Sequence, residues 1–193
     1  ELEPTVTLYE SLYQNNSVEQ GEPADRLDDV IKNFNSFNYA IFRTSYVKSF
    51  FGIMDFLDND DFQFFQKSWA YTSAVLGKCK RLQNQSYYYF IPGESTLQDG
   101  RIHKFSQWAG TRYWSCSGPR IISMITSLHQ SLYQVDIRER FATTFINEIL
   151  DKGHYGQPDG DFIGQLCELS LNHDSQTQEA ISKCSFEYES FDY

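Results

Sequence analysis

Apolar residues recur at helical spacing along most of the chain, and the alternation typical of a strand is rare. The first stripe predicts a long helix over 24–57. Helix-forming residues are scarce at Asn33–Asn38, so we expect a kink or a break there. Two further stripes predict a helix over 60–83 and another over 119–152 that ends at a glycine.

The segment 86–119 interrupts this periodicity. Its glycine and proline turn signals follow one another too closely for long elements, although Tyr87–Ile91 could form one short strand. Shorter helical patterns resume over 161–171 and 176–184. The pattern therefore predicts an all-α fold, an irregular bundle of about four or five helices with a long aromatic- and Gly-rich loop in the middle.

The length of 193 residues suits one domain with a full hydrophobic core. We expect a flexible N-terminal segment over 1–21, a single helical domain over 22–184 and an acidic aromatic tail over 185–193. No run of about 18 apolar residues occurs, so the sequence predicts no membrane span.

Charge is segregated along the chain. The net charge is −10, yet the block from Lys78 to Val135 holds seven Lys and Arg against two Asp and Glu. The same block places aromatic residues on a turn-rich backbone, where binding residues often lie. Guanidinium groups interleaved with π-faces are typical of sites for anionic, planar or glycan ligands. The predicted surface for a protein partner or a small anionic or aromatic ligand consists of Arg101, His103, Lys104, Trp108, Arg112, Tyr113 and Trp114.

A structural interpretation of this block stays open. Trp108 and Trp114 could anchor the loop on the bundle while the cations pair with acidic helices opposite. Lys78, Lys80 and Arg81 lie near a helix end, where cations complement the helix dipole. A nucleic-acid role is disfavoured, because a net charge of −10 repels a phosphate backbone.

Cysteine usage and the start of the chain indicate export. None of the four cysteines belongs to a C-x-x-C pair, which favours disulfides. The expected bonds are the sequence-local ones, Cys79–Cys116 and Cys167–Cys184. The chain starts at Glu1 without a methionine or a hydrophobic signal segment, as in a processed secretory protein or a trimmed chain. With sequons at Asn15 and Asn84, these features predict a secreted, extracellular glycoprotein.

Catalytic motifs are scarce, so an enzyme is the alternative prediction. His154 with Asp159 and Asp161 could form an acid–base site, although the same residues fit a surface turn. His103 is a second candidate for a hydrolase. His129 lies beside an apolar stripe, where we expect a partly buried structural histidine. The sequence predicts no metal and no other cofactor.

An acidic cluster, Asp58–Asp61, precedes the second predicted helix. Carboxylates in this position can cap the positive end of a helix. A calcium loop is the other interpretation, but the glycine and the closing glutamate of an EF-hand are missing. We therefore expect capping.

The end of the chain alternates aromatic and acidic residues over Phe186–Tyr193. Tyrosines beside acidic residues are candidate sulfation sites. The segment resembles the acidic aromatic tails of thrombin inhibitors from blood-feeding animals, and the resemblance extends over no other part of the chain. A solvated, disordered end is the other interpretation.

Together these patterns predict a secreted, disulfide-stabilised helical binding protein that acts through its basic aromatic loop. A hydrolase-type enzyme and a structural or storage protein are the alternatives. Binding would place function in the loop and the tail, whereas hydrolysis would require carboxylates that converge on His154 or His103. A structural protein requires neither.

Overall fold

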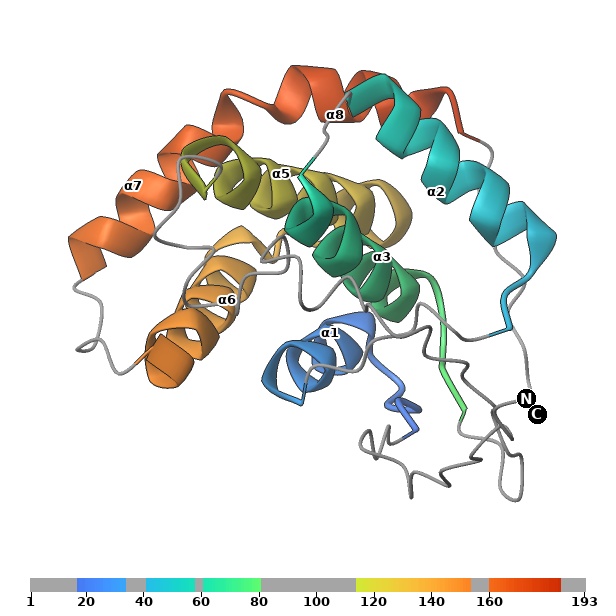
Figure 1. The fold of residues 1–193 in the computed structure, drawn as a ribbon, viewed down its shortest axis with the longest axis horizontal. Coiled ribbons are helices and arrows are strands. Elements are labelled where there is room, and N and C mark those ends of the chain that lie inside the picture. The colour runs from blue at the N-terminus through green and yellow to red at the C-terminus, as the bar shows by residue number, and fades with distance from the viewer. Residues whose placement is uncertain (1–16, 34–40, 58–60, 81–113, 154–159, 185–193) are drawn as a thin grey trace, which may run out of the picture.

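The computed structural model describes residues 17–33, 41–57, 61–80, 114–153 and 160–184 (Figure 1). Within these ranges it is all-helical, as predicted, with one isolated antiparallel β-bridge between Val18 and Cys79. The helices are α1 (Pro23–Lys32), α2 (Thr44–Leu57), α3 (Phe62–Leu76), α5 (Trp114–Tyr133), α6 (Arg138–Gly153), α7 (Gly160–Leu171) and α8 (Asp174–Ser182).

These seven helices exceed the predicted number because two predicted long helices are each divided. The helix expected over 24–57 forms α1 and α2, and α1 ends at Asn33, whose side-chain and backbone N–H groups both bond to Asp29. The helix expected over 119–152 forms α5 and α6. They separate at Gln134, where a φ of 59° places the backbone in the left-handed region that ends helices.

The start of α5 also differs from the prediction. α5 begins at Trp114 and contains Pro119, whereas the sequence predicted a helix only after this proline. Proline removes one helical hydrogen bond, a loss that the packing of a 20-residue helix on its neighbours offsets. Gly118 lets the Trp114 ring lie against the helix, because a Cβ at Gly118 would come within 2.9 Å of that ring.

α5 is the centre of the bundle and packs against α3, α6, α7 and α8. All residues from Ile121 to His129 are buried, so this part of the helix is enclosed on every side. In Figure 1, α7, α8 and α2 form an outer arc, and α5 and α3 lie inside it.

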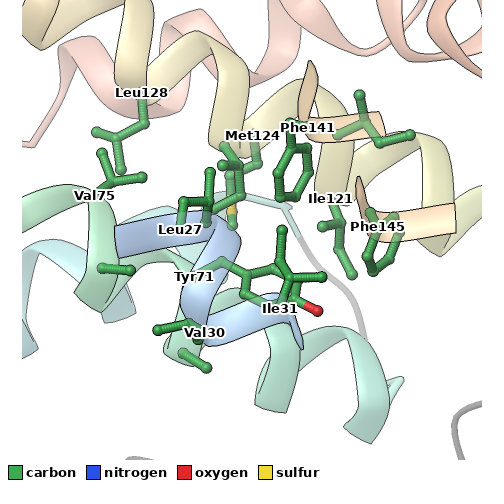
Figure 2. Packing of buried hydrophobic residues seen from close by; sticks show 14 of the residues in the cluster. Leu27, Val30, Ile31, Tyr71, Val75, Ile121, Met124, Leu128, Phe141 and Phe145 are labelled. Carbon is green, nitrogen blue, oxygen red and sulfur yellow. The ribbon is translucent and has the colours of Figure 1, made fainter. Parts of the chain in front are cut away.

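The main core lies where α1, α3, α5 and α6 meet (Figure 2). Tyr71 of α3 is fully buried, and its ring meets the rings of Phe141 and Phe145 edge-on at 5.7 and 5.8 Å. Leu27 and Ile31 of α1 pack into the same cluster. Burial raises the pKa of Tyr71 well above its usual value, so its phenol stays neutral within this apolar core.

A set of paired polar side chains joins α8 to the rest of the bundle. Ser123 Oγ in α5 donates to Asp174 Oδ1 at 2.7 Å and lies 2.9 Å from Thr177 Oγ1. Arg138, the first residue of α6, pairs with Asp174 at 2.6 Å and donates to Ser170 Oγ in α7. Because these groups satisfy one another, the set ties four helices together without an uncompensated charge.

The residues before α1 are fixed to the C-terminal end of α3. Val18 is fully buried and exchanges two backbone hydrogen bonds with Cys79, at 2.7 and 2.9 Å. The buried Arg26 guanidinium donates to four backbone carbonyls, those of Gln20, Gly21, Ala74 and Val75. Residues 17–21, which the sequence placed in the N-terminal segment, are therefore held against the bundle.

The predicted disulfides Cys79–Cys116 and Cys167–Cys184 are not formed, since all four cysteines are free. The thiol of Cys184 instead packs on α2 and donates to the Ser49 carbonyl at 3.4 Å. Cys79 lies in the β-bridge, and Cys116 is exposed at the start of α5. Proximity in sequence is a poor guide to disulfide pairing because tertiary packing decides where each thiol lies.

We expect Ellman's reagent to titrate four thiols in the unfolded, unreduced protein. In the folded protein Cys116 should react first because it is exposed. Cys79 should react last, because burial raises the pKa of its thiol to about 11 despite the opposing charge of Arg26. Peptide mapping of the labelled protein gives the order, and the absence of titratable thiols after unfolding would restore the disulfide prediction.

Candidate partner-binding surface

Six of the seven predicted binding residues lie outside the described residues, namely Arg101, His103, Lys104, Trp108, Arg112 and Tyr113. Also outside are the sequons at Asn15 and Asn84, the possible strand over 87–91 and the tail. Trp114 is described. It is half-buried, and its ring lies 5.8 Å from the ring of Phe145. Trp114 therefore packs on the bundle, as the structural interpretation of the basic block expected.

The described residues locate both ends of the segment 81–113. The chain reaches Lys80 just beyond the C-terminal end of α3, and it re-enters at Trp114 near the N-terminal end of α3. The hydrogen bond from Ser117 Oγ to Asp61 Oδ2, at 2.6 Å, fixes the second end. Because α3 has 15 residues, the two ends are about 20 Å apart. The basic aromatic segment therefore links opposite ends of one helix.

Two groups at this junction have structural roles. Asp61 caps α3 by accepting a hydrogen bond from the Gln63 N–H at 3.0 Å, which confirms the predicted capping. Arg120, the last cation of the basic block, donates to the Leu57 carbonyl at the end of α2, at 3.1 Å. Nowhere in the described ranges do three His, Cys, Asp or Glu side chains group closely enough to hold a metal ion.

Six aromatic rings form one continuous cluster between α2 and α3, which we call the aromatic cluster. Trp69 lies at its centre, and its ring centroid is 4.6 to 6.1 Å from those of five other rings. The geometries are mostly edge-to-face, which favours ring pairs beyond the burial of their area. The five rings around Trp69 are those of Phe42, Tyr46, Phe50, Phe51 and Phe65.

A hydrogen-bonded phenol fixes the inner side of this cluster. Tyr46 Oη donates to the Trp69 carbonyl at 3.0 Å and lies 2.8 Å from Ser73 Oγ. Burial raises the pKa of Tyr46 far above its usual value, although the Ser73 hydrogen bond acts in the opposite direction. The phenol is therefore neutral, and these contacts hold α2 against α3.

The outer side of the aromatic cluster reaches solvent. Phe51 is 49% exposed, although its ring contacts Phe50, Phe65 and Trp69. Phe62 is 47% exposed and precedes Phe65 by one helical turn, so both lie on the same face of α3. Phe51 is thus a half-exposed ring on a packed aromatic base, and Phe62 is a second half-exposed ring one turn from that base, so both offer apolar surface to a partner. We call Phe51 and Phe62 the exposed ring pair.

Sequence reasoning missed this surface because it counted Phe51 as part of a buried stripe. A signal was present in the pair Phe50-Phe51. Neighbouring residues in a helix point about 100° apart, so both rings cannot face the core centrally. The adjacent phenylalanines Phe64 and Phe65 on α3 carry the same signal, and only Phe64 is fully buried.

The groups considered for catalysis are not brought together in the described part of the chain. His154, Asp159 and His103 fall outside it, and Asp161 is exposed in the first turn of α7, where an acidic residue suits the helix dipole. The imidazole Nδ1 of His129 is hydrogen-bonded to the Val135 carbonyl at 3.0 Å. This bond spans the turn after α5. Burial lowers the pKa of His129, as expected for a structural histidine.

Among the described helices, none combines the length and the apolar character needed to cross a membrane. The chain matches no protein-family model, and no curated protein or solved structure is significantly similar to it.

Proposed function

We propose that this chain is a helical binding protein that engages a small anionic aromatic ligand or a protein partner with aromatic and acidic side chains. The observation that carries the proposal is the exposed ring pair, in which Phe51 rests on the aromatic cluster and Phe62 lies one helical turn before Phe65 on α3. The cations Arg101, Lys104 and Arg112 of the basic segment supply the opposite charge for an anion. Extracellular location and glycosylation at Asn15 and Asn84 are part of the same proposal.

Rigid aromatic side chains favour binding because little conformational entropy is lost when they are covered. Phe51 already rests on Phe65 and Trp69, with centroid distances of 6.0 and 5.9 Å, so a ligand would not have to order it. Half of its surface is still in water, and covering that surface is favourable. Such anchors carry much of the affinity in protein interfaces.

The test uses 8-anilinonaphthalene-1-sulfonate, a planar aromatic anion, as the probe. We expect the Phe51→Ser/Phe62→Ser double variant and the Lys104→Ala/Arg112→Ala double variant each to weaken binding about tenfold, as losses of about 1.4 kcal/mol require. Added salt should weaken binding to the wild type, because it screens the cationic contribution. Fluorescence titration provides the dissociation constants.

The matched control is Leu171→Ser, which also removes an exposed apolar side chain but lies on α7, away from the aromatic cluster. It should leave the dissociation constant unchanged. Melting temperatures should fall by only a few degrees in any variant, because the substituted side chains are half-exposed or charged. Equal loss of binding in the Leu171→Ser control, or unchanged binding in both double variants, would refute the proposed function.

A further inference from the structure

The last described residues lie against α2 and run toward its N-terminal end. Lys183 Nζ lies 4.2 Å above the ring centroid of Phe56. One residue later, the Cys184 thiol contacts the middle of α2, with its donor bond to the Ser49 carbonyl at 3.4 Å and Gly52 beside it. Lys183 thus contacts Phe56 near the end of α2, whereas Cys184 contacts Gly52 and Ser49, which lie closer to its N-terminal end. The chain is directed toward Thr44.

The N-terminal half of α2 is apolar and cationic on its exposed side. Ile41, just before the helix, is 93% exposed, and Lys48 and Arg43 are exposed cations. The first turn of α2 contains no acidic residue, so the positive end of its helix dipole has no carboxylate within this turn. This end of α2 thus offers positive charge beside apolar surface.

The nine residues after Cys184 have complementary chemistry. Four of these nine residues are aromatic. Three others, Glu187, Glu189 and Asp192, are acidic. Nine residues can extend about 30 Å. The path from Ser49 to Ile41 is about 20 Å at most, so the segment is long enough to follow it.

We propose that the segment Phe186–Tyr193 binds along the N-terminal half of α2, with its carboxylates against Lys48 and its rings over Ile41. Charge complementarity, chain direction and reach all select this occupant over an outside partner. The contact is intramolecular and does not depend on the proposed function, because the exposed ring pair and the probe are not needed for it.

Zero-length crosslinking of the full chain with a carbodiimide tests this contact, because it joins only carboxylates and amines that touch. In the monomer fraction we expect Lys48 to link to Glu187 or Glu189, and the yield to fall at about 0.5 M salt, where exposed charges are screened. Lys32 is the matched control, since it is also exposed but lies at the end of α1. Peptide mass spectrometry identifies the links.

A second measurement follows chymotrypsin cleavage after Tyr188 in the folded protein. Lys48→Gln should speed this cleavage about fivefold, the change in population set by about 1 kcal/mol of ion pairing, and Lys32→Gln should not change it. Links from Glu187 or Glu189 that are as frequent to Lys32 as to Lys48, or no links at all, would overturn the proposal. So would a cleavage rate that Lys48→Gln leaves unchanged.

Discussion

Replacing Phe145 by alanine should lower the free energy of unfolding by about 3–5 kcal/mol, the usual cost of deleting a buried large aromatic side chain. Phe145 is fully buried, and its ring stacks on Phe141 at 5.6 Å and contacts Tyr71 at 5.8 Å. It also supports Trp114 at the start of α5. Removing it would leave a cavity where three helices meet. Urea unfolding followed by circular dichroism measures the change.

The control for this prediction is Phe51→Ala, which deletes the same side chain at a half-exposed position. Its expected cost is about 1 kcal/mol, because little of the ring is removed from a closed core. If the two variants lost similar amounts of stability, the Phe145 side chain would not be buried in the core as the structure shows.

Replacing Arg26 by methionine should lower the free energy of unfolding by about 3 kcal/mol. Each hydrogen bond to a charged group contributes about 1.5–3 kcal/mol, and the cost of burying the charge offsets part of the total. The side chain is only 3% exposed, and methionine would fill much of its volume. The carbonyls of Ala74 and Val75 at the end of α3 would lose a buried donor. The loss should appear in urea unfolding and as faster hydrogen exchange at Val18 and Cys79.

Arg140 provides the comparison, because it makes ion pairs that are shorter but exposed. It lies 2.6 Å from Asp25 and 2.8 Å from Asp28, while 48% of its side chain is in solvent. We expect Arg140→Met to cost less than about 1 kcal/mol, since solvent screens exposed pairs. If Arg140→Met were the more damaging substitution, burial would not be what makes the Arg26 contacts important.

The sequence predicted the helical class because apolar spacing reports which side of each helix is buried. It did not place the ends of the helices, which depend on local contacts. The break at Asn33 was expected from its composition, but the break at Gln134 depends on one left-handed residue and on the His129 contact to Val135. Pro119 was taken as a boundary because the packing that lets α5 continue through it is tertiary.

The candidate surface was less predictable than the fold. A hydrophobic stripe does not say which of its rings are half in water, and the exposure of Phe51 depends on how α2 packs on Phe65 and Trp69 of α3. The free thiols illustrate the same limit, because Cys184 meets Ser49, which is 135 residues away in the chain. Residue chemistry alone could suggest the basic segment, whereas the exposed ring pair required the packing of two helices.

The N-terminal helices α1 and α2 pack on α3, which follows them closely, but also on helices late in the sequence, and this affects how the chain folds during synthesis. α1 is joined to α6 through Arg140 and Asp28, 112 residues apart, and α2 rests on the residues that follow α8. At the usual ribosomal rate of about 5–20 residues per second, α1 would wait on the order of ten seconds for α6. During that time α1 and α2 can pack on α3, but the faces that α6 and α8 later cover stay open to wrong contacts until the second half of the chain has emerged.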